Sequence, residues 1–195
     1  ARALAPLRRH PRLTLQLLLD DALVDLIEAR VDIALRAGSL PDSSLVARRL
    51  GSVGAQMCAA PAYLAGRGWP GAPRDLAQHD WLGARPFGTA TQSLALHSDA
   101  GETATVQVNS RAQASQVTAL HALCVEGWGI GVVVSEDDRR ALADGRLVPV
   151  LPGWQLPDLP VYAVTPRRGE QPAKVRHALA LLEAHFDLLP GPAAG

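Results

Sequence analysis

The sequence predicts an α/β fold with mixed sheets, and three observations support that prediction. Short apolar runs of strand length alternate along the chain with stretches whose apolar residues recur at helical spacing. The chain has 195 residues, of which 48% are hydrophobic and 19% charged, so it can bury a substantial core. A strand, a helix and a second strand follow one another within residues 13–35, which predicts a βαβ unit with a parallel strand pair.

The amino-terminal residues predict a helix and then a strand. Residues 1–9 carry Leu4 and Leu7 at helical spacing but begin without a capping signal. Residues 13–19 alternate leucine with polar side chains, and Leu18 adds an apolar group on the second face. We therefore expect a strand that has apolar residues on both of its faces.

The next helix, capped by Asp20 or Asp21, is expected to end near Arg30. A buried strand over residues 31–35 should follow, and small or turn-forming residues then interrupt it before residues 45–50 resume as an extended piece. A buried strand that ends in such a turn leaves backbone N–H groups and Arg36 facing a crevice. In open α/β sheets, ligands bind beyond the carboxyl ends of the strands.

The middle of the chain predicts a long strand, a helix and a hairpin. Residues 50–60 form a small-residue strand, and Pro61 ends it and opens a helix. A Gly- and Pro-rich loop with a short helical piece and a short strand follow at residues 66–79 and 81–83, and then a loop at residues 85–89. Residues 94–97 and 105–108 are expected to pair as a hairpin.

The last third of the chain alternates helices with strands. Ser115 is expected to cap a helix that carries Val117, Leu120 and Cys124 on one face and that Gly127 ends. Further strands are predicted at residues 130–134, 147–151 and 161–165. Further helices are predicted at residues 135–143, which open on a capping-box pattern, and at residues 172–186.

The charge balance argues against direct DNA binding by this chain, and the surroundings of the cysteines predict that they lie in the core. The 19 basic residues equal the 19 acidic residues, whereas a chain that grips DNA phosphates usually has a basic excess. Cys58 and Cys124 lie in apolar stretches and are expected to be small core residues. The chain shows no signal peptide and no long apolar span, so we expect a cytoplasmic protein without membrane contact.

Motifs for catalysis, metals and cofactors are absent from the sequence. It contains no Gly-x-Ser-x-Gly elbow, no Walker loop and no His-Glu-x-x-His. The six histidines show no ligand spacing, and each is expected on the surface or on a helix face. We therefore expect no enzyme, no catalytic residues, no bound metal and no cofactor.

Residues 127–131, Gly-Trp-Gly-Ile-Gly, suggest a dinucleotide loop but stand in the wrong context. A helix precedes them and a strand follows, which is the reverse of that fingerprint. They are better explained as a helix stop and a tight turn, with ligand contact through Trp128 and Gly129 as the alternative. Of the four tryptophans, Trp128 is the candidate for contact with a ligand or a partner.

Other candidate contacts have two interpretations each. Lys174 is the only lysine, so the basic residues are almost all arginine, either through codon bias or because guanidinium groups grip a carboxylate ligand. Arg36 either faces a ligand or pairs with a nearby aspartate. Ser115 with Gln116 either forms a weak anion site at a helix start or only caps it. The loop over residues 85–89 either closes a cleft or is solvated with Phe87 in the core.

Several segments resemble the effector-binding domain of LysR-type transcriptional regulators. They read Asp-Ile-Ala-Leu-Arg-Ala-Gly at residues 32–38 and Asp-Ser-Ser-Leu-Val-Ala-Arg-Arg-Leu at residues 42–50. The likeness continues at residues 59–65, 145–152 and 172–176, and it covers nearly the whole chain in the family's order.

This resemblance implies a two-lobed, periplasmic-binding-protein-like fold with two crossover strands. Residues 1–58 and 159–195 would form lobe I, and residues 59–158 would form lobe II. A small-molecule effector, with a carboxylate as the candidate class, would bind between the lobes. The residues expected to contact it are Arg36, Gly38, Ser39, Arg85, Phe87, Gly88, Ser115, Trp128 and Gly129.

The resemblance also implies partners. The family pairs as dimers or tetramers, here through residues 1–19 of one copy against residues 116–126 of the other. The family's opening strand, first loop and helix-turn-helix domain are missing before residue 1, so the chain is expected to be a fragment that meets DNA only through an absent domain. The alternative function is that of a periplasmic solute-binding protein of the same fold.

Overall fold

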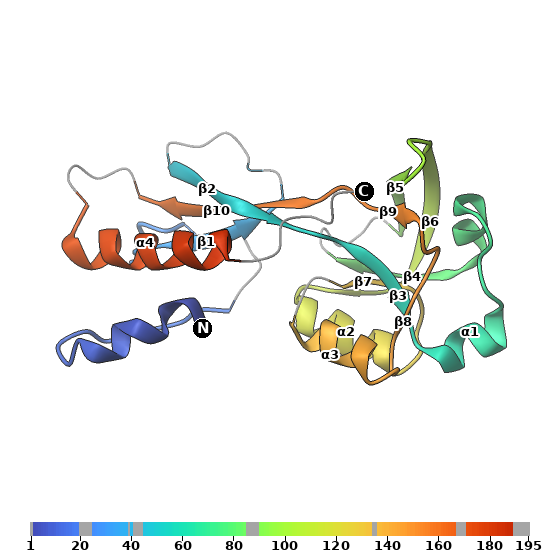
Figure 1. Ribbon diagram of the computed structural model, residues 1–195, viewed down its shortest axis with the longest axis horizontal. Helices are drawn as coiled ribbons and strands as arrows, with labels where there is room; N and C mark the ends of the chain where they lie inside the picture. Colours follow the sequence, from blue (N-terminus) through green and yellow to red (C-terminus); the bar gives the residue numbers. More distant parts are fainter. Residues whose placement is uncertain are drawn as a thin grey trace. The chain divides into compact units, whose positions relative to one another are not determined.

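The computed structural model describes residues 2–19, 25–38, 40, 45–84, 90–133, 136–166 and 171–188. The chain divides into two compact units (Figure 1). The first unit consists of Ala1–Val53 and Asp158–Ala194, and the second consists of Gly54–Pro157. The chain therefore passes from one unit to the other twice. In the part of the chain that is described, no helix combines the length and the apolar character needed to cross a bilayer.

The first unit is built on a three-stranded antiparallel sheet. Its order is β1 (Ala34–Ala37), β10 (Leu159–Thr165) and β2 (Val46–Val53). The helix α4 (Ala173–Asp187) packs on this sheet, and the buried residues between them are Leu50, Ala163, Val175, Leu179 and Leu182. The helical spacing of these α4 residues was predicted from the sequence and is confirmed.

A close contact between β2 and α4 and an amino-terminal helix complete the first unit. A Cβ on Gly51 would lie 3.3 Å from a ring carbon of Phe186, so glycine lets β2 and α4 approach closely. The predicted amino-terminal helix is present as a 3-10 helix, η1 (Arg2–Arg9), which contains Pro6. Leu4 of η1 packs against the same core cluster, and Leu7 is buried.

The predicted βαβ unit is wrong. Residues 13–19 form no strand, and residues 26–30 form only a turn in place of the expected helix end. The Asp25 carboxylate accepts hydrogen bonds from the N–H groups of Ile27 and Glu28, and Arg30 adopts a positive φ of 53°. The helical hydrogen bonding stops after this single turn, because the left-handed backbone of Arg30 reverses the direction of the chain. The strand that follows, β1, pairs antiparallel with β10 rather than parallel.

The second unit contains two sheets. The first has the order β7 (Gly131–Val133), β3 (Gln56–Ala59) and β8 (Val148–Pro149), with both neighbours antiparallel to β3. The second has the order β4 (Asp80–Ala84), β6 (Thr103–Ala114), β5 (Thr91–Ser98) and β9 (Trp154–Gln155). β5 and β6 form the predicted antiparallel hairpin, whereas β4 runs parallel to β6.

Four helical segments accompany these sheets. They are α1 (Pro61–Arg67), the 3-10 helix η2 (Pro73–Gln78), α2 (Val117–Val125) and α3 (Glu136–Ala143). Pro61 opens α1, as predicted. The single strand predicted over residues 50–60 is instead divided into β2 and β3, which belong to different units. The predicted capping box at residues 135–138 lies outside the described side chains.

The two sheets of the second unit meet at β4. The Ile130 N–H donates to the Asp80 carbonyl at 2.9 Å, and the Leu82 N–H donates to the Ile130 carbonyl at 2.9 Å. The core around this junction includes Met57, Leu64, Leu76, Trp81 and Ile130. Cys58 and Cys124 are buried beside it, and the Cys124 thiol donates to the Cys58 carbonyl at 3.3 Å. The prediction that both cysteines are small core residues is confirmed.

Candidate functional site

Residues 126–128 end α2 in a Schellman motif. The Gly127 N–H donates to the Cys124 carbonyl and the Trp128 N–H to the Leu123 carbonyl, both at 3.0 Å. Gly127 has a φ of 76°, which a glycine adopts without strain. The helix stop predicted from the sequence is therefore confirmed. A strand follows this turn rather than a helix, which excludes a dinucleotide-binding loop here.

The turn places Trp128 and Gly129 against β4 and β6. Gly129 is buried, and a Cβ there would lie 2.4 Å from the Asp80 carbonyl oxygen, so only glycine fits. The Trp128 side chain is 48% exposed, and the Arg111 guanidinium carbon lies 5.9 Å from the centre of its ring. Arg111 Nη1 also donates to Asp80 Oδ2 at 3.2 Å. The result is a half-exposed indole beside a held guanidinium.

Arg111 and Asp80 were not among the residues predicted from the sequence. The two residues are far apart in the chain and meet because β4 runs parallel to β6, with Asp80 opposite Asn109 and Trp81 opposite Ser110. No residue type or spacing in the sequence signals this register. The signal that existed was Trp128 itself, a large aromatic residue between two glycines.

Ser115 does not cap α2, in contrast to the prediction. Gln116 occupies the N-cap position with extended backbone angles, and no side chain makes a capping hydrogen bond there. Its carbonyl, and not the Ser115 hydroxyl, begins the helical hydrogen bonding. Because α2 has nine residues, Ser115 and Trp128 stand at opposite ends of a helix about 13 Å long. The structure therefore does not bring these two candidate residues together.

The first unit places Arg36 and Gly38 at the end of β1. Arg36 is half-buried opposite Tyr162 and interacts with another residue, so both of its interpretations stay open. Gly38 has a φ of 91°, and its N–H donates to the Pro160 carbonyl at 2.9 Å. This N–H group is used within the sheet and does not face an open crevice, in contrast to the prediction. Four other candidates lie outside the described residues, namely Ser39, Arg85, Phe87 and Gly88.

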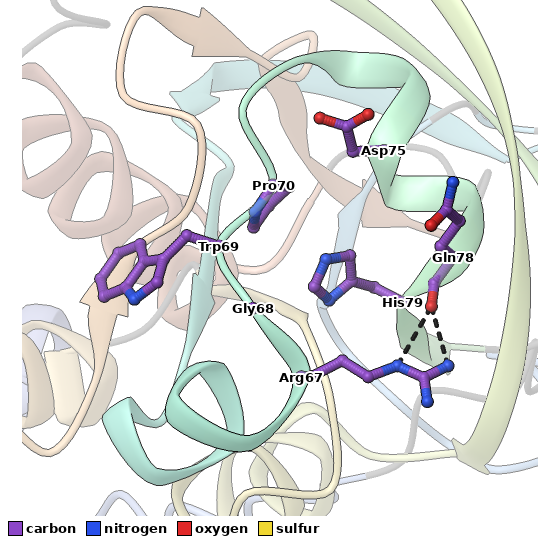
Figure 2. A pocket seen from close by; sticks show the side chains of 7 residues that line it. All are labelled: Arg67, Gly68, Trp69, Pro70, Asp75, Gln78 and His79. Atoms are coloured by element: carbon purple, nitrogen blue, oxygen red, sulfur yellow. Dashed lines mark hydrogen bonds between the residues drawn. The ribbon is translucent and has the colours of Figure 1, made fainter.

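The second unit also contains a cavity of about 450 Å³ that the sequence did not predict. It lies between the end of α1 and η2 (Figure 2) and is lined by Arg67, Gly68, Trp69, Pro70, Asp75, Gln78 and His79. The imidazole of His79 stands at its centre in this view. His79 is buried, so the expectation that every histidine lies on the surface or on a helix face is wrong for this residue.

The His79 imidazole contacts the Tyr63 hydroxyl and is buried beside it. The Tyr63 hydroxyl accepts a hydrogen bond from the Asp80 N–H at 2.8 Å and lies 3.2 Å from His79 Nδ1. Burial raises the pKa of Tyr63, so its hydroxyl is protonated at neutral pH. Burial, followed by the Arg67 charge, lowers the pKa of His79. Both effects favour the neutral imidazole of His79 at pH 7.

Comparison with known proteins identifies relatives along most of the chain. A sequence model of the family described as "LysR substrate binding domain" matches residues 2–187. The HTH-type transcriptional regulator PtxR of Pseudomonas aeruginosa is 35% identical over 185 residues, which cover 94% of this chain and 58% of the relative. The HTH-type transcriptional regulator CrgA of Neisseria meningitidis serogroup C is 35% identical over 153 residues, covering 76% and 50%. The chain thus spans between 50% and 58% of the length of these curated relatives.

Solved structures show the same likeness. The regulatory domain of CrgA, a LysR-type transcriptional regulator from Neisseria meningitidis, matches with a TM-score of 0.75 at 32% identity, covering 94% of this chain and 91% of that one. The full-length Vibrio cholerae virulence activator AphB matches with a TM-score of 0.74 at 29% identity, covering 92% of this chain and 60% of that one. Both matches include residues of the first and second units.

Proposed function

The chain belongs to the LysR substrate-binding domain family, and from this premise we propose how it acts within a longer protein. It is the effector-binding domain of a transcriptional regulator and has the two-lobed, periplasmic-binding-protein-like fold of such domains. We propose that a small molecule bound to this domain controls transcription by biasing its conformation. The family match over residues 2–187 is the observation that carries this function.

DNA contact is proposed to lie in another segment of the longer protein. The relatives PtxR and CrgA are named HTH-type regulators, and this chain spans 58% and 50% of their lengths. The chain has equal numbers of basic and acidic residues, whereas binding to DNA phosphates favours a basic excess. This balance also supports DNA contact by another segment. A periplasmic solute-binding protein is not favoured, since these relatives are transcriptional regulators.

We propose a carboxylate as the effector class. The half-exposed Trp128 ring beside the Arg111 guanidinium offers an apolar face next to a cation. In the first unit, Arg36 is proposed to contact the effector from the end of β1. The full set of proposed effector-binding residues is Arg36, Gly38, Ser39, Arg85, Phe87, Gly88, Ser115, Trp128 and Gly129.

Calorimetric titration of the chain with a panel of small carboxylates tests this proposal. For a carboxylate that binds, we expect Trp128→Ala and Arg36→Gln each to weaken binding by at least about tenfold, the loss typical of a charged or aromatic anchor. The matched control is Arg74→Gln, which removes an exposed cation elsewhere in the second unit. If both test variants bind like the unmodified chain, the residue assignment fails. If no carboxylate binds, the proposed effector class fails.

A homodimer, or a tetramer built from it, is the proposed assembly. Leu15, Leu17, Leu18 and Leu19 are all exposed, and Leu18 keeps 70% of its surface accessible. A run of adjacent exposed leucines marks an interaction surface in a globular protein. We propose that residues 2–19 pack against α2 of a second copy, where Val117 is exposed as well.

Replacing Leu18 by aspartate is expected to shift the chain from dimer to monomer. A buried, unpaired carboxylate at an interface costs several kcal/mol, enough to raise the dimer dissociation constant by about a hundredfold or more. Light scattering over a concentration series measures this shift. Leu188→Asp is the control, because Leu188 is equally apolar and exposed but ends α4 outside the proposed interface. A monomeric unmodified chain, or an unchanged dimer in Leu18→Asp, would contradict the proposed surface.

A further inference from the structure

Asp80, the first residue of β4, contacts three different elements of the second unit through its polar groups. Its N–H donates to the Tyr63 hydroxyl of α1 at 2.8 Å, and its carbonyl accepts from the Ile130 N–H at 2.9 Å. Its side-chain Oδ2 accepts from Arg111 Nη1 of β6 at 3.2 Å. A change at any one of these contacts therefore acts on a residue that the other two also hold.

The Tyr63 hydroxyl joins Asp80 to a titratable group, the imidazole of His79. It lies 3.2 Å from His79 Nδ1, and the centres of the two rings are 5.8 Å apart. A protonated imidazole carries a proton on both ring nitrogens, so its Nδ1 can only donate. The Tyr63 oxygen would then accept from His79 as well as from the Asp80 N–H. The contact that holds the start of β4 therefore depends on the charge of His79.

The charged groups around His79 come from three elements. Arg67 of α1 and Asp75 of η2 lie on either side of its ring (Figure 2), and Asp80 of β4 follows it in the chain. Burial and then the Arg67 charge lower the pKa of His79, whereas Asp80 and Asp75 raise it. Asp75 is already held by two backbone N–H groups. An imidazolium at position 79 would therefore attract the Asp80 carboxylate in competition with Arg111.

Arg111 connects Asp80 to Trp128. Its guanidinium carbon lies 5.9 Å from the centre of the Trp128 ring, close to the limit of about 6 Å for such contacts. A small displacement of Arg111 would therefore end the contact. The turn that carries Trp128 also lies against α1, because a Cβ on Gly127 would be 3.8 Å from the Tyr63 Cβ.

We propose that Tyr63 and His79 form a proton-operated pair that positions Arg111 beside Trp128. With His79 neutral, Tyr63 holds the start of β4 and the Asp80 carboxylate holds Arg111 beside the indole. When His79 takes up a proton, its Nδ1–H competes for the Tyr63 oxygen and its charge draws the Asp80 carboxylate. Arg111 then leaves the indole. Tyr63 and His79 are positioning residues that act on Trp128 through other side chains, whichever effector the domain binds.

The direction of the pH dependence follows from the burial of His79. The pKa of His79 in the folded chain is lower than the ordinary histidine value of about 6.5. The stability that neutral His79 contributes is therefore fully present above about pH 6.5 and is lost as the pH falls through the folded-state pKa. We expect the Trp128 indole to respond in the same range, below about pH 6.5.

An acid titration of the unmodified chain, followed by nitrogen-edited NMR, is the first test. The range from about pH 8 to about pH 5 covers ordinary histidine titration and stays above the ordinary pKa of Asp and Glu. Trp128→Phe assigns the Trp128 indole signal, and His79→Gln assigns the ring signals of His79. We expect the Trp128 signal to shift with the same midpoint as the His79 ring. An unmoved Trp128 signal, or a midpoint that follows His97 or His121 instead, overturns the proposal.

Variants of the two residues test the link itself. His79→Gln takes up no proton in this range and should remove the acid shift of Trp128. Tyr63→Phe keeps the ring but loses the hydroxyl, so its Trp128 signal at about pH 8 should lie near the acid position of the unmodified chain and shift little further. The controls are His97→Gln, on the exposed side of β5, and Tyr162→Phe, in the first unit, and both should keep the full shift.

Two results with these variants would overturn the proposal. One is an acid shift of Trp128 that persists in His79→Gln. The other is a Tyr63→Phe variant whose Trp128 signal behaves like that of Tyr162→Phe. Circular dichroism at each pH shows whether a variant is folded, and the comparison of midpoints in the unmodified chain decides the proposal if a variant is not.

Discussion

Replacing Gly129 by alanine is expected to lower the free energy of unfolding by about 3 kcal/mol or more. The added Cβ would lie 2.4 Å from the Asp80 carbonyl oxygen and 3.0 Å from its carbonyl carbon. Both are backbone atoms, so no side chain can rotate away to relieve the contact. One of the two segments would have to move.

Neither segment is free to move without loss. Asp80 begins β4, which pairs with β6, and its carbonyl accepts a hydrogen bond from the Ile130 N–H at 2.9 Å. Ile130 is fully buried in the core that also contains Trp81. Separating Gly129 from β4 would therefore break a buried backbone hydrogen bond and open the packing beside it.

Urea unfolding followed by circular dichroism measures this effect. The matched control is Gly66→Ala in α1, where a new Cβ would have nothing within 4 Å. Alanine is favoured over glycine inside a helix, so this control should be neutral or stabilising by up to about 1 kcal/mol. A Gly129→Ala variant as stable as the unmodified chain would contradict the close approach of residue 129 to β4.

Much of the second unit could be predicted from the sequence because its signals are local. The β5–β6 hairpin follows from two alternating runs around a Gly-containing turn. The helix stop at Gly127 follows from a glycine placed directly after an apolar helical face. The same applies to α4 in the first unit, whose buried residues repeat at helical spacing. In each case the residues that determine the structure are neighbours in the chain.

The predictions that failed concern contacts between residues that are distant in the sequence. The alternating pattern of residues 13–19 does not say which strand would pair with them. The structure has no strand within that stretch. The direction of β1 is set by β10, more than a hundred residues later. The contact of Arg111 with Asp80 and Trp128 requires the parallel register of β4 and β6. The burial of His79 depends on Tyr63, whose hydroxyl also holds the Asp80 N–H.

Replacing Trp81 by alanine is expected to cost about 3–5 kcal/mol, the range for losing a buried large aromatic side chain. Trp81 is 2% exposed and lies in the main core cluster with Met57, Val108 and Ile130. It also pairs with Ser110 of β6 and forms a bridge to Ile130, so the residue joins both sheets of the second unit. The cavity left by the indole would open at that junction, where strand pairing on both sides prevents collapse.

Trp69→Ala is the matched control, since it deletes the same side chain from an exposed position. Away from the core such a deletion changes stability by only about 0.5 kcal/mol. Urea unfolding of both variants should therefore separate them clearly, with unchanged denaturant slopes if each still unfolds in one step. Equal losses in the two variants would mean that Trp81 does not anchor the core. If Trp81→Ala alone is strongly destabilised, the β4 junction stabilises the second unit as a whole. Because Gly129 and Trp128 lie at the same junction, variants of these residues must be checked for folding. Only then can a loss of ligand binding be assigned to a lost direct contact.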